Sequence, residues 1–200
     1  NKWANLTALL MVLDGLNLVM SRTALLDIFL TLFILLSVNA WLKGKYLNFA
    51  IYLGLAMGCK WSALYFIIAF LVLELVINRN LLRVIRVGLT TVGIYLLTWF
   101  GWFASSLGWD RDSRSNPIAS LIYYHKEMLA FHTGLTEKHS YQANPWSCIV
   151  MGRPTSFFYQ SPKGCGSKSC AQEVLAIGTP ILWWLGALAL VVLIGINLHN

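Results

Sequence analysis

Charged residues are scarce in this sequence, and their scarcity limits what the protein can be. Only 12% of the 200 residues are charged, 58% are hydrophobic, and the mean hydropathy is +0.64. A soluble domain of this size usually carries about a quarter charged residues. We therefore exclude an ordinary soluble domain and expect a membrane protein with several spans.

A basic stripe with interleaved aromatic residues is also lacking. The formal net charge is +7, but the Lys and Arg residues punctuate apolar segments instead of forming one patch. That distribution is typical of residues that set membrane orientation. We expect no nucleic-acid partner.

The sequence lacks the paired motifs of a zinc site. It has four cysteines, and no second pair at ligand spacing follows the CGSKSC segment that holds Cys165 and Cys170. These two form a small disulfide if their polar loop faces an oxidising compartment, and remain thiols otherwise.

Three histidines recur every seven residues, at His125, His132 and His139. On one continuous helix they would form a stripe. However, Gly134 predicts the end of the helix before His139, and no carboxylate completes a ligand set. We expect His125 and His132 to make polar contacts at an interface, and we expect no metal and no cofactor.

Long apolar runs are what the sequence does contain. A transmembrane helix needs about 20 apolar residues. The sequence predicts spans at about 4–20, 23–41, 61–78, 83–103 and 177–197, with a shorter one at 47–58. We expect an all-α polytopic membrane protein with about six spans.

The predicted spans divide the chain into three regions. Residues 1–103 form transmembrane helices, 104–174 an extracytoplasmic loop, and 175–200 a further transmembrane helix. Within the loop, residues 117–132 alternate apolar and polar residues near helical spacing. This pattern predicts an amphipathic helix lying in the membrane interface.

The distribution of Lys and Arg predicts the orientation. The short loops around Lys43 and Arg83 are rich in basic residues and should be cytoplasmic. Both loops lie inside only if the chain turns at the GCKW segment, residues 58–61. Lys60, the turn at Arg22 and the 104–174 loop then face outward.

Placing a charged residue within or at the end of a membrane span costs free energy, so such residues are usually functional or paired with one another. Asp14, Arg22 and Asp27 are of this kind, whereas we interpret Glu74 as an ordinary boundary residue. Arg22 either pairs with an aspartate or binds an anion, because its guanidinium matches phosphate oxygens. Lys60 either snorkels beside a tryptophan or supplies a second positive charge.

Four blocks of sequence carry a family resemblance. They are SRTALLDIFLTLF (21–33), GLAMGCKWSALYF (54–66), HSYQANPWSCIVMGRPTSFFY (139–159) and CGSKSCAQEVLAIGTPILWW (165–184). In this order they resemble the actinobacterial-type protein O-mannosyltransferases, relatives of the eukaryotic dolichyl-phosphate-mannose–protein mannosyltransferases.

This resemblance implies a GT-C-type glycosyltransferase transmembrane bundle in the cell membrane, with an outward-facing site. It implies inverting transfer of mannose from a polyprenyl-phosphate-mannose donor to Ser/Thr hydroxyls. The expected acceptors are secreted proteins, met at the export translocon, and membrane lipid is a further partner. The family is expected to need no metal.

The resemblance also implies a general base in an Asp-Glu pair of the first outer loop. This chain contains no Asp-Glu dipeptide. We therefore expect a middle fragment of a longer enzyme, inactive on its own.

Candidate site residues follow from both lines of reasoning. Arg22 is the first candidate for the lipid phosphate, followed by His139, Arg153 and Lys60. Asp27 is expected to orient Arg22, and Asp14 is a second orienting candidate. The candidates for binding sugar or acceptor are Tyr141, Gln142 and Trp146. Alternatively, this loop simply folds over the membrane surface.

Two other functions compete with mannosyl transfer to protein. One is another GT-C transferase that uses a polyprenyl-phosphate sugar. The other is a non-catalytic membrane subunit or transporter, which predicts polar residues at the membrane midplane. Polar residues gather instead at the outer ends of the predicted spans, which disfavours transport.

Overall fold

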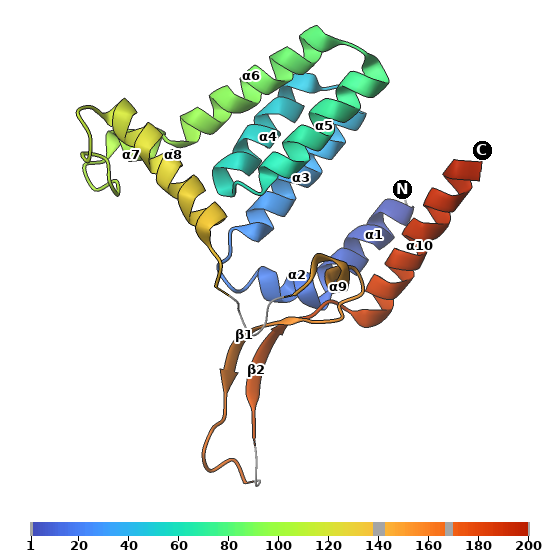
Figure 1. Ribbon diagram of the computed structural model, residues 1–200. Coiled ribbons are helices and arrows are strands. Elements are labelled where there is room, and N and C mark those ends of the chain that lie inside the picture. The colour runs from blue at the N-terminus through green and yellow to red at the C-terminus, as the bar shows by residue number, and fades with distance from the viewer. Residues whose placement is uncertain (1, 138–142, 167–169, 200) are drawn as a thin grey trace. The chain divides into compact units, whose positions relative to one another are not determined.

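The computed structural model describes residues 2–137, 143–166 and 170–199 and divides them between two compact units. One unit comprises residues 26–136, and the other comprises residues 1–25 together with 137–200. Figure 1 labels the helices and strands of both. The two units are distinguished by the contacts that residues make within each of them. The predicted boundaries at 103 and 174 concern membrane topology instead, and they stay predictions.

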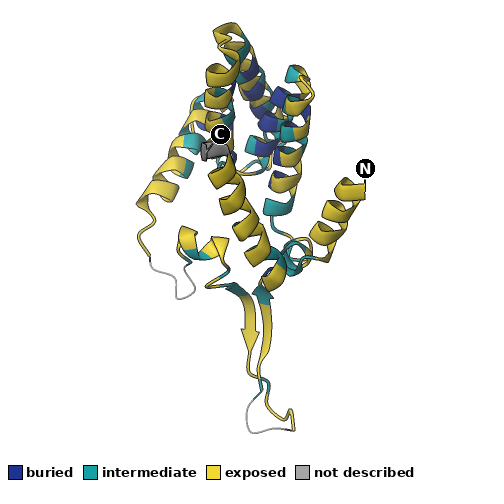
Figure 2. Cartoon of the chain, turned by 90° about the vertical axis from the view of Figure 1, so that its right-hand side faces the viewer, coloured by how far each residue is buried: buried dark blue, intermediate teal, exposed yellow. Residues whose placement is uncertain are grey.

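The regular secondary structure of the 26–136 unit consists of helices. Its helices are α3 (Asp27–Leu42), α4 (Tyr46–Cys59), α5 (Ala63–Asn78), α6 (Leu81–Thr98), α7 (Phe100–Ala104) and α8 (Pro117–Gly134). Short turns connect the consecutive helices α3, α4, α5 and α6. Each of these helices therefore runs in the opposite direction to the one before it. Figure 2 shows the buried residues gathered in this bundle.

Helix α4 is the centre of the bundle because it packs against both α3 and α6. Its Phe49 and Leu53 are fully buried. Gly54 allows the close approach of α6, since a Cβ there would lie 2.7 Å from the Thr91 carbonyl oxygen. The Thr91 hydroxyl donates a hydrogen bond of 3.2 Å to the Ala50 carbonyl, which ties the two helices together.

The predicted turn at 58–61 is confirmed. Helix α4 ends at Cys59, Lys60 is extended with φ −160° and ψ 136°, and α5 begins at Ala63. The predicted amphipathic helix is also confirmed as a helix, because Asn116 caps α8 and Pro117 occupies its first turn. Its position at the membrane interface stays a prediction.

The other unit contains helices and a hairpin. Its elements are α1 (Lys2–Leu13), α2 (Gly15–Met20), α9 (Pro145–Ile149), β1 (Thr155–Gln160), β2 (Gln172–Ala176) and α10 (Pro180–His199). The prediction of one continuous helix over 4–20 is wrong, because the chain breaks at Asp14, which caps α2.

Strands β1 and β2 form an antiparallel pair, from Thr155 opposite Ala176 to Gln160 opposite Gln172. The prediction of an all-α fold is wrong for these residues. The segment TSFFYQ is rich in aromatic residues and has a β-branched residue, which favours a strand over the loop that we expected.

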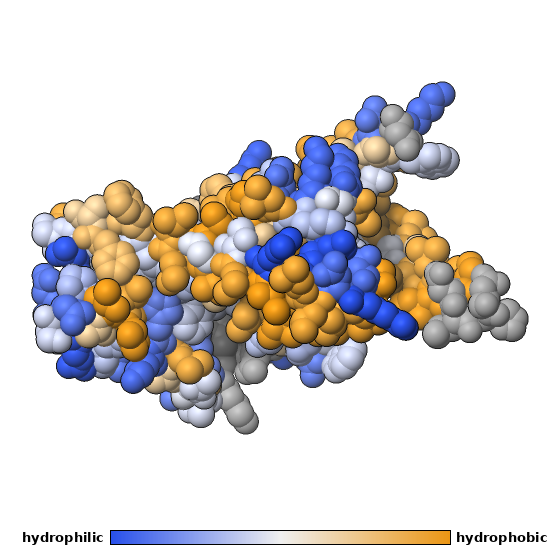
Figure 3. Space-filling model, turned by 90° about the horizontal axis from the view of Figure 1, so that it is seen from above, coloured by the Kyte–Doolittle hydropathy of each residue, from blue (hydrophilic) through white to orange (hydrophobic). Residues whose placement is uncertain are grey.

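The helices and their surfaces are strongly apolar. Within the described residues, only Leu81–Ala104 is both long and apolar enough to cross a bilayer, and five shorter helices are apolar. Large apolar side chains are exposed along most helices, and Figure 3 shows hydrophobic side chains over much of the visible face. The structure is mostly helical, and the count of six spans stays a prediction.

Candidate functional site

Lys60 and Asp27 form an ion pair in the helical bundle. Because α3 and α4 are antiparallel, the first residue of α3 lies beside the last turn of α4. The Lys60 ammonium lies 2.8 Å and 3.0 Å from the two Asp27 carboxylate oxygens. Both side chains are partly exposed, at 48% and 33%, so the ammonium remains accessible.

A cavity of about 390 Å³ opens next to this ion pair. Its lining includes Lys60, Trp61, Tyr95, Trp99, Trp102 and His132. The volume lies within the range of about 300–1,000 Å³ that is typical of small-molecule sites. Aromatic rings therefore form its walls, and a cation lies at its edge.

A chain of hydrogen bonds fixes one wall of this cavity. The Trp61 indole Nε1 donates to the Tyr95 hydroxyl oxygen over 3.0 Å. That hydroxyl lies 2.7 Å from Nε2 of His125, whose Nδ1 lies 2.8 Å from the Leu121 carbonyl oxygen. Since a carbonyl only accepts, the network assigns the proton to Nδ1, and the Tyr95 hydroxyl donates to Nε2.

This arrangement suits a ligand that combines a sugar with a phosphate. An indole face packs against the C–H groups of a pyranose ring, and an ammonium binds phosphate oxygens as a compact point charge. The Trp99 ring also lies 4.9 Å from the His125 ring, so the wall is built from packed side chains.

Asp14 organises the start of α10 in the other unit. Its carboxylate accepts hydrogen bonds from the backbone N–H of Asn17 at 3.2 Å and of Thr179 at 2.8 Å. It also accepts one from the Trp183 indole at 3.1 Å. These contacts cap α2 and fix the start of α10 against it. The predicted role of Asp14 in orienting Arg22 stays a prediction.

The remaining candidates are distributed as follows. Arg22 is exposed in the turn after α2, and its backbone N–H donates to the Val19 carbonyl oxygen over 3.0 Å. Trp146 is 78% exposed in α9, and Arg153 is exposed just before β1. The other three, His139, Tyr141 and Gln142, lie outside the described residues. Convergence of Arg22 with this loop stays a prediction.

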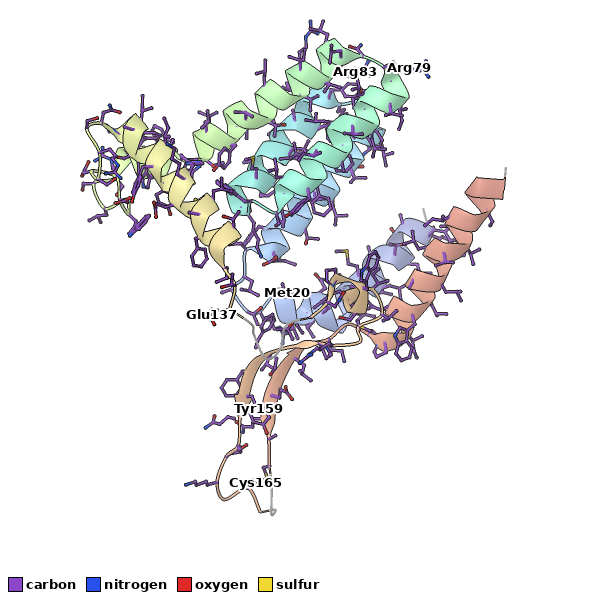
Figure 4. All side chains as sticks on the ribbon, in the orientation of Figure 1. Met20, Arg79, Arg83, Glu137, Tyr159 and Cys165 are labelled. Atoms are coloured by element: carbon purple, nitrogen blue, oxygen red, sulfur yellow. A yellow bond between two sulfur atoms is a disulfide. The ribbon has the colours of Figure 1, made fainter. Side chains whose placement is uncertain are left out.

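Cys165 and Cys170 are joined by a disulfide at the end of the β1–β2 hairpin, with their Cα atoms 6.4 Å apart. Figure 4 labels Cys165 and Tyr159 on this hairpin. Cys59 and Cys148 are free thiols.

The pKa of the Tyr123 phenol on α8 is raised. The nearby Glu127 carboxylate raises the pKa of Tyr123 above its ordinary value, with a smaller opposing effect from Arg114. The Arg114 guanidinium lies 3.8 Å from the centre of the Tyr123 ring. Tyr123 therefore loses its phenolic proton only at a higher pH than an ordinary tyrosine.

Sequence reasoning missed Tyr95, Trp99 and His132 as members of one cavity. A usable signal was present, because Tyr95 and Trp99 are four residues apart and share one helix face. That spacing, combined with Trp102, marks an aromatic face at the end of a predicted span.

Comparison with known proteins identifies the family. Residues 1–107 match a family described as dolichyl-phosphate-mannose-protein mannosyltransferase. Residues 117–200 match the C-terminal four TMM region of protein-O-mannosyltransferase. The chain belongs to the protein O-mannosyltransferase family. The resemblance drawn from the four sequence blocks is confirmed.

Several relatives of this chain come from actinobacteria. It is 26% identical to the polyprenol-phosphate-mannose–protein mannosyltransferase of Mycobacterium tuberculosis, over 90% of this chain and 47% of the relative. For the proteins of that name from Mycolicibacterium smegmatis and Corynebacterium glutamicum, the identities are 28% and 26%, over 90% of this chain and 48% of each relative. The chain thus spans about half the length of these relatives. No solved structure matches it.

Proposed function

We propose that the protein containing this chain transfers mannose from a polyprenyl-phosphate carrier to Ser/Thr hydroxyls of exported proteins, at the outer face of the cell membrane. The observation that carries the proposal is the order of the two family matches, which together cover residues 1–107 and 117–200. The names of the relatives support the same donor and a protein acceptor.

The cavity beside Lys60 has a role in this proposal. The acceptor oxygen attacks the anomeric carbon, the bond from that carbon to the phosphate oxygen breaks, and its electron pair stays on the phosphate. Lys60 stabilises the negative charge that builds there. Asp27, which the sequence led us to expect as a partner of Arg22, holds the Lys60 ammonium in this proposal. The indoles of Trp61 and Trp99 pack against the mannose.

The proton of the acceptor hydroxyl needs a general base. Lys60 already binds the Asp27 carboxylate, and three N–H groups occupy that of Asp14. We assign the base to the part of the relatives' length that this chain does not span. The further proposed phosphate contacts are Arg22, His139 and Arg153, and the proposed sugar or acceptor contacts are Tyr141, Gln142 and Trp146.

The test measures transfer of labelled mannose from polyprenyl-phosphate-mannose to a Ser/Thr-rich peptide by the full-length protein. Lys60→Ala and Arg22→Ala should each lower the rate roughly tenfold or more, because each removes a charged hydrogen-bond donor from the leaving phosphate. Lys43→Ala, which removes an exposed charge outside the cavity, is the matched control.

Membrane levels of all variants are compared by immunoblot. Equal rates for Lys60→Ala and Lys43→Ala would contradict the role of the cavity. The unaltered protein could instead transfer the label to a lipid or a glycan and not to the peptide. That result would favour another transferase that uses a polyprenyl-phosphate sugar.

A further inference from the structure

A second cavity lies at the opposite end of the helical bundle from Lys60. The α3–α4 and α5–α6 turns meet at this end because successive helices alternate in direction. The cavity has a volume of about 470 Å³, and its lining includes Tyr46, Leu47, Asn80, Leu82, Arg83 and Arg86. Figure 4 labels Arg79 and Arg83 at this end.

Arg83 is held in this cavity by a buried acid. Its Nη1 donates to the Glu74 carboxylate and to the Tyr46 hydroxyl oxygen, both over 2.9 Å. The Glu74 side chain has no exposed surface, and it also accepts from the Trp41 indole at 2.7 Å and the Asn78 amide at 2.9 Å. The interpretation of Glu74 as an ordinary boundary residue is therefore wrong.

The contacts of Arg83 leave donors for a ligand. The guanidinium has five N–H groups, and the two contacts engage only Nη1. The Arg83 side chain is 31% exposed and lines the cavity, so the guanidinium is partly accessible to a ligand there. The Tyr46 ring lies 4.2 Å from the guanidinium carbon, which fixes the plane of the guanidinium.

Arg86 supplies a second cation from the same helix face, three residues after Arg83. It is exposed, and within the part of the chain that the structure describes its guanidinium has no ion-pair partner. Glu74 balances only Arg83, so the cavity keeps an excess positive charge. Its other walls are apolar side chains such as Leu47 and Leu82.

We propose that this cavity binds the phosphate headgroup of an anionic phospholipid from the cytoplasmic leaflet. The planar guanidinium groups of Arg83 and Arg86 match the geometry of phosphate oxygens. The side-chain amide of Asn80 offers a hydrogen bond to the headgroup hydroxyls. The apolar wall fits the beginning of an acyl chain. A free phosphate shares the charge chemistry but gains nothing from that wall. The proposal does not depend on mannosyl transfer.

The test uses the full-length protein in neutral detergent, with bound lipid counted by native mass spectrometry. Phosphatidylglycerol should bind, and phosphatidylcholine should not. Arg86→Ala should weaken phosphatidylglycerol binding roughly tenfold or more, since it removes a charged donor pair. Lys43→Ala removes one positive charge at the same end of the bundle but outside the cavity. It should weaken phosphatidylglycerol binding at most about fivefold.

A substitution that keeps the net charge distinguishes binding in the cavity from attraction by general surface charge. Thr90 also lines the cavity, so Thr90→Phe should reduce phosphatidylglycerol binding without changing the net charge. Unchanged melting temperatures show that the variants are folded, and Arg86 is exposed, so its replacement leaves the core intact.

Three results would overturn the proposal. Equal losses for Arg86→Ala and Lys43→Ala would mean that only general surface charge attracts the lipid. Retained binding in Thr90→Phe would exclude this cavity. Inorganic phosphate that displaces phosphatidylglycerol with equal affinity would identify a free-phosphate site instead.

Discussion

Glu74 shows how much one buried side chain contributes to this bundle. Three side chains, those of Trp41, Asn78 and Arg83, donate to its carboxylate. The sequence indicates only an acid near the end of an apolar run, because its partners lie on three different helices. Packing of α3, α5 and α6 creates the site, and this packing has no local signature in the sequence.

Replacing Glu74 should destabilise the protein. Glu74→Leu leaves the Arg83 charge without its counter-ion and two N–H donors without an acceptor, so the free energy of unfolding should fall by about 3 kcal/mol. The measurement is the melting temperature of the full-length protein in detergent. Glu127→Leu, at an exposed position of α8, is the control and should change stability by less than about 0.5 kcal/mol. Equal shifts for both variants would contradict the structural role of Glu74.

At the scale of helices and strands, sequence reasoning succeeded where the signal is local. The turn at residues 58–61 was predicted from the basic residues of the two flanking loops, and helix α8 was predicted from the periodic pattern of residues 117–132. It failed at Asp14, because this residue breaks a long apolar run by capping α2 and binding Thr179, which is distant in the sequence. The β1–β2 pair was missed because each strand is short and its partner is not adjacent.

The close contact between α4 and α6 gives a sharp prediction for two glycines. Gly54→Ala would place a Cβ 2.6 Å from the Ile94 Cβ and 2.7 Å from the Thr91 carbonyl oxygen. The helices must then separate, at a cost of about 1–3 kcal/mol in the free energy of unfolding. Gly93→Ala on α6 meets no atom within 4 Å and should stabilise by about 0.5–1 kcal/mol. Thermal unfolding of both variants checks this, and a neutral Gly54→Ala would contradict the packing.

At the scale of the whole molecule, the two ends of the bundle differ in chemistry. One end gathers Lys43, Arg79, Arg83 and Arg86, and the other gathers aromatic rings around Lys60. Composition predicted a membrane protein, and charge counts predicted which end is cytoplasmic. The aromatic cavity was not predicted because its aromatic residues come from the α4–α5 turn, α6, α7 and α8, and they meet only after packing.

Orientation is testable with single cysteines in the full-length protein after its other free thiols are replaced. Ser161→Cys, after β1, should react with a membrane-impermeant maleimide in intact cells because we predict that this loop faces outward. Lys43→Cys, in the predicted cytoplasmic turn, should react only after permeabilisation. The reverse pattern would contradict the predicted topology.

The most direct test of the account asks whether the cavity beside Lys60 holds the donor from the outer side. Thr98 lines that cavity and is exposed, so Thr98→Cys introduces a reporter thiol. In the full-length protein with Cys59 and Cys148 replaced, an impermeant maleimide should modify this thiol in intact cells. Saturating polyprenyl-phosphate-mannose, added to the purified protein, should slow the reaction. Modification only after permeabilisation, or a rate that the donor leaves unchanged, would contradict the account.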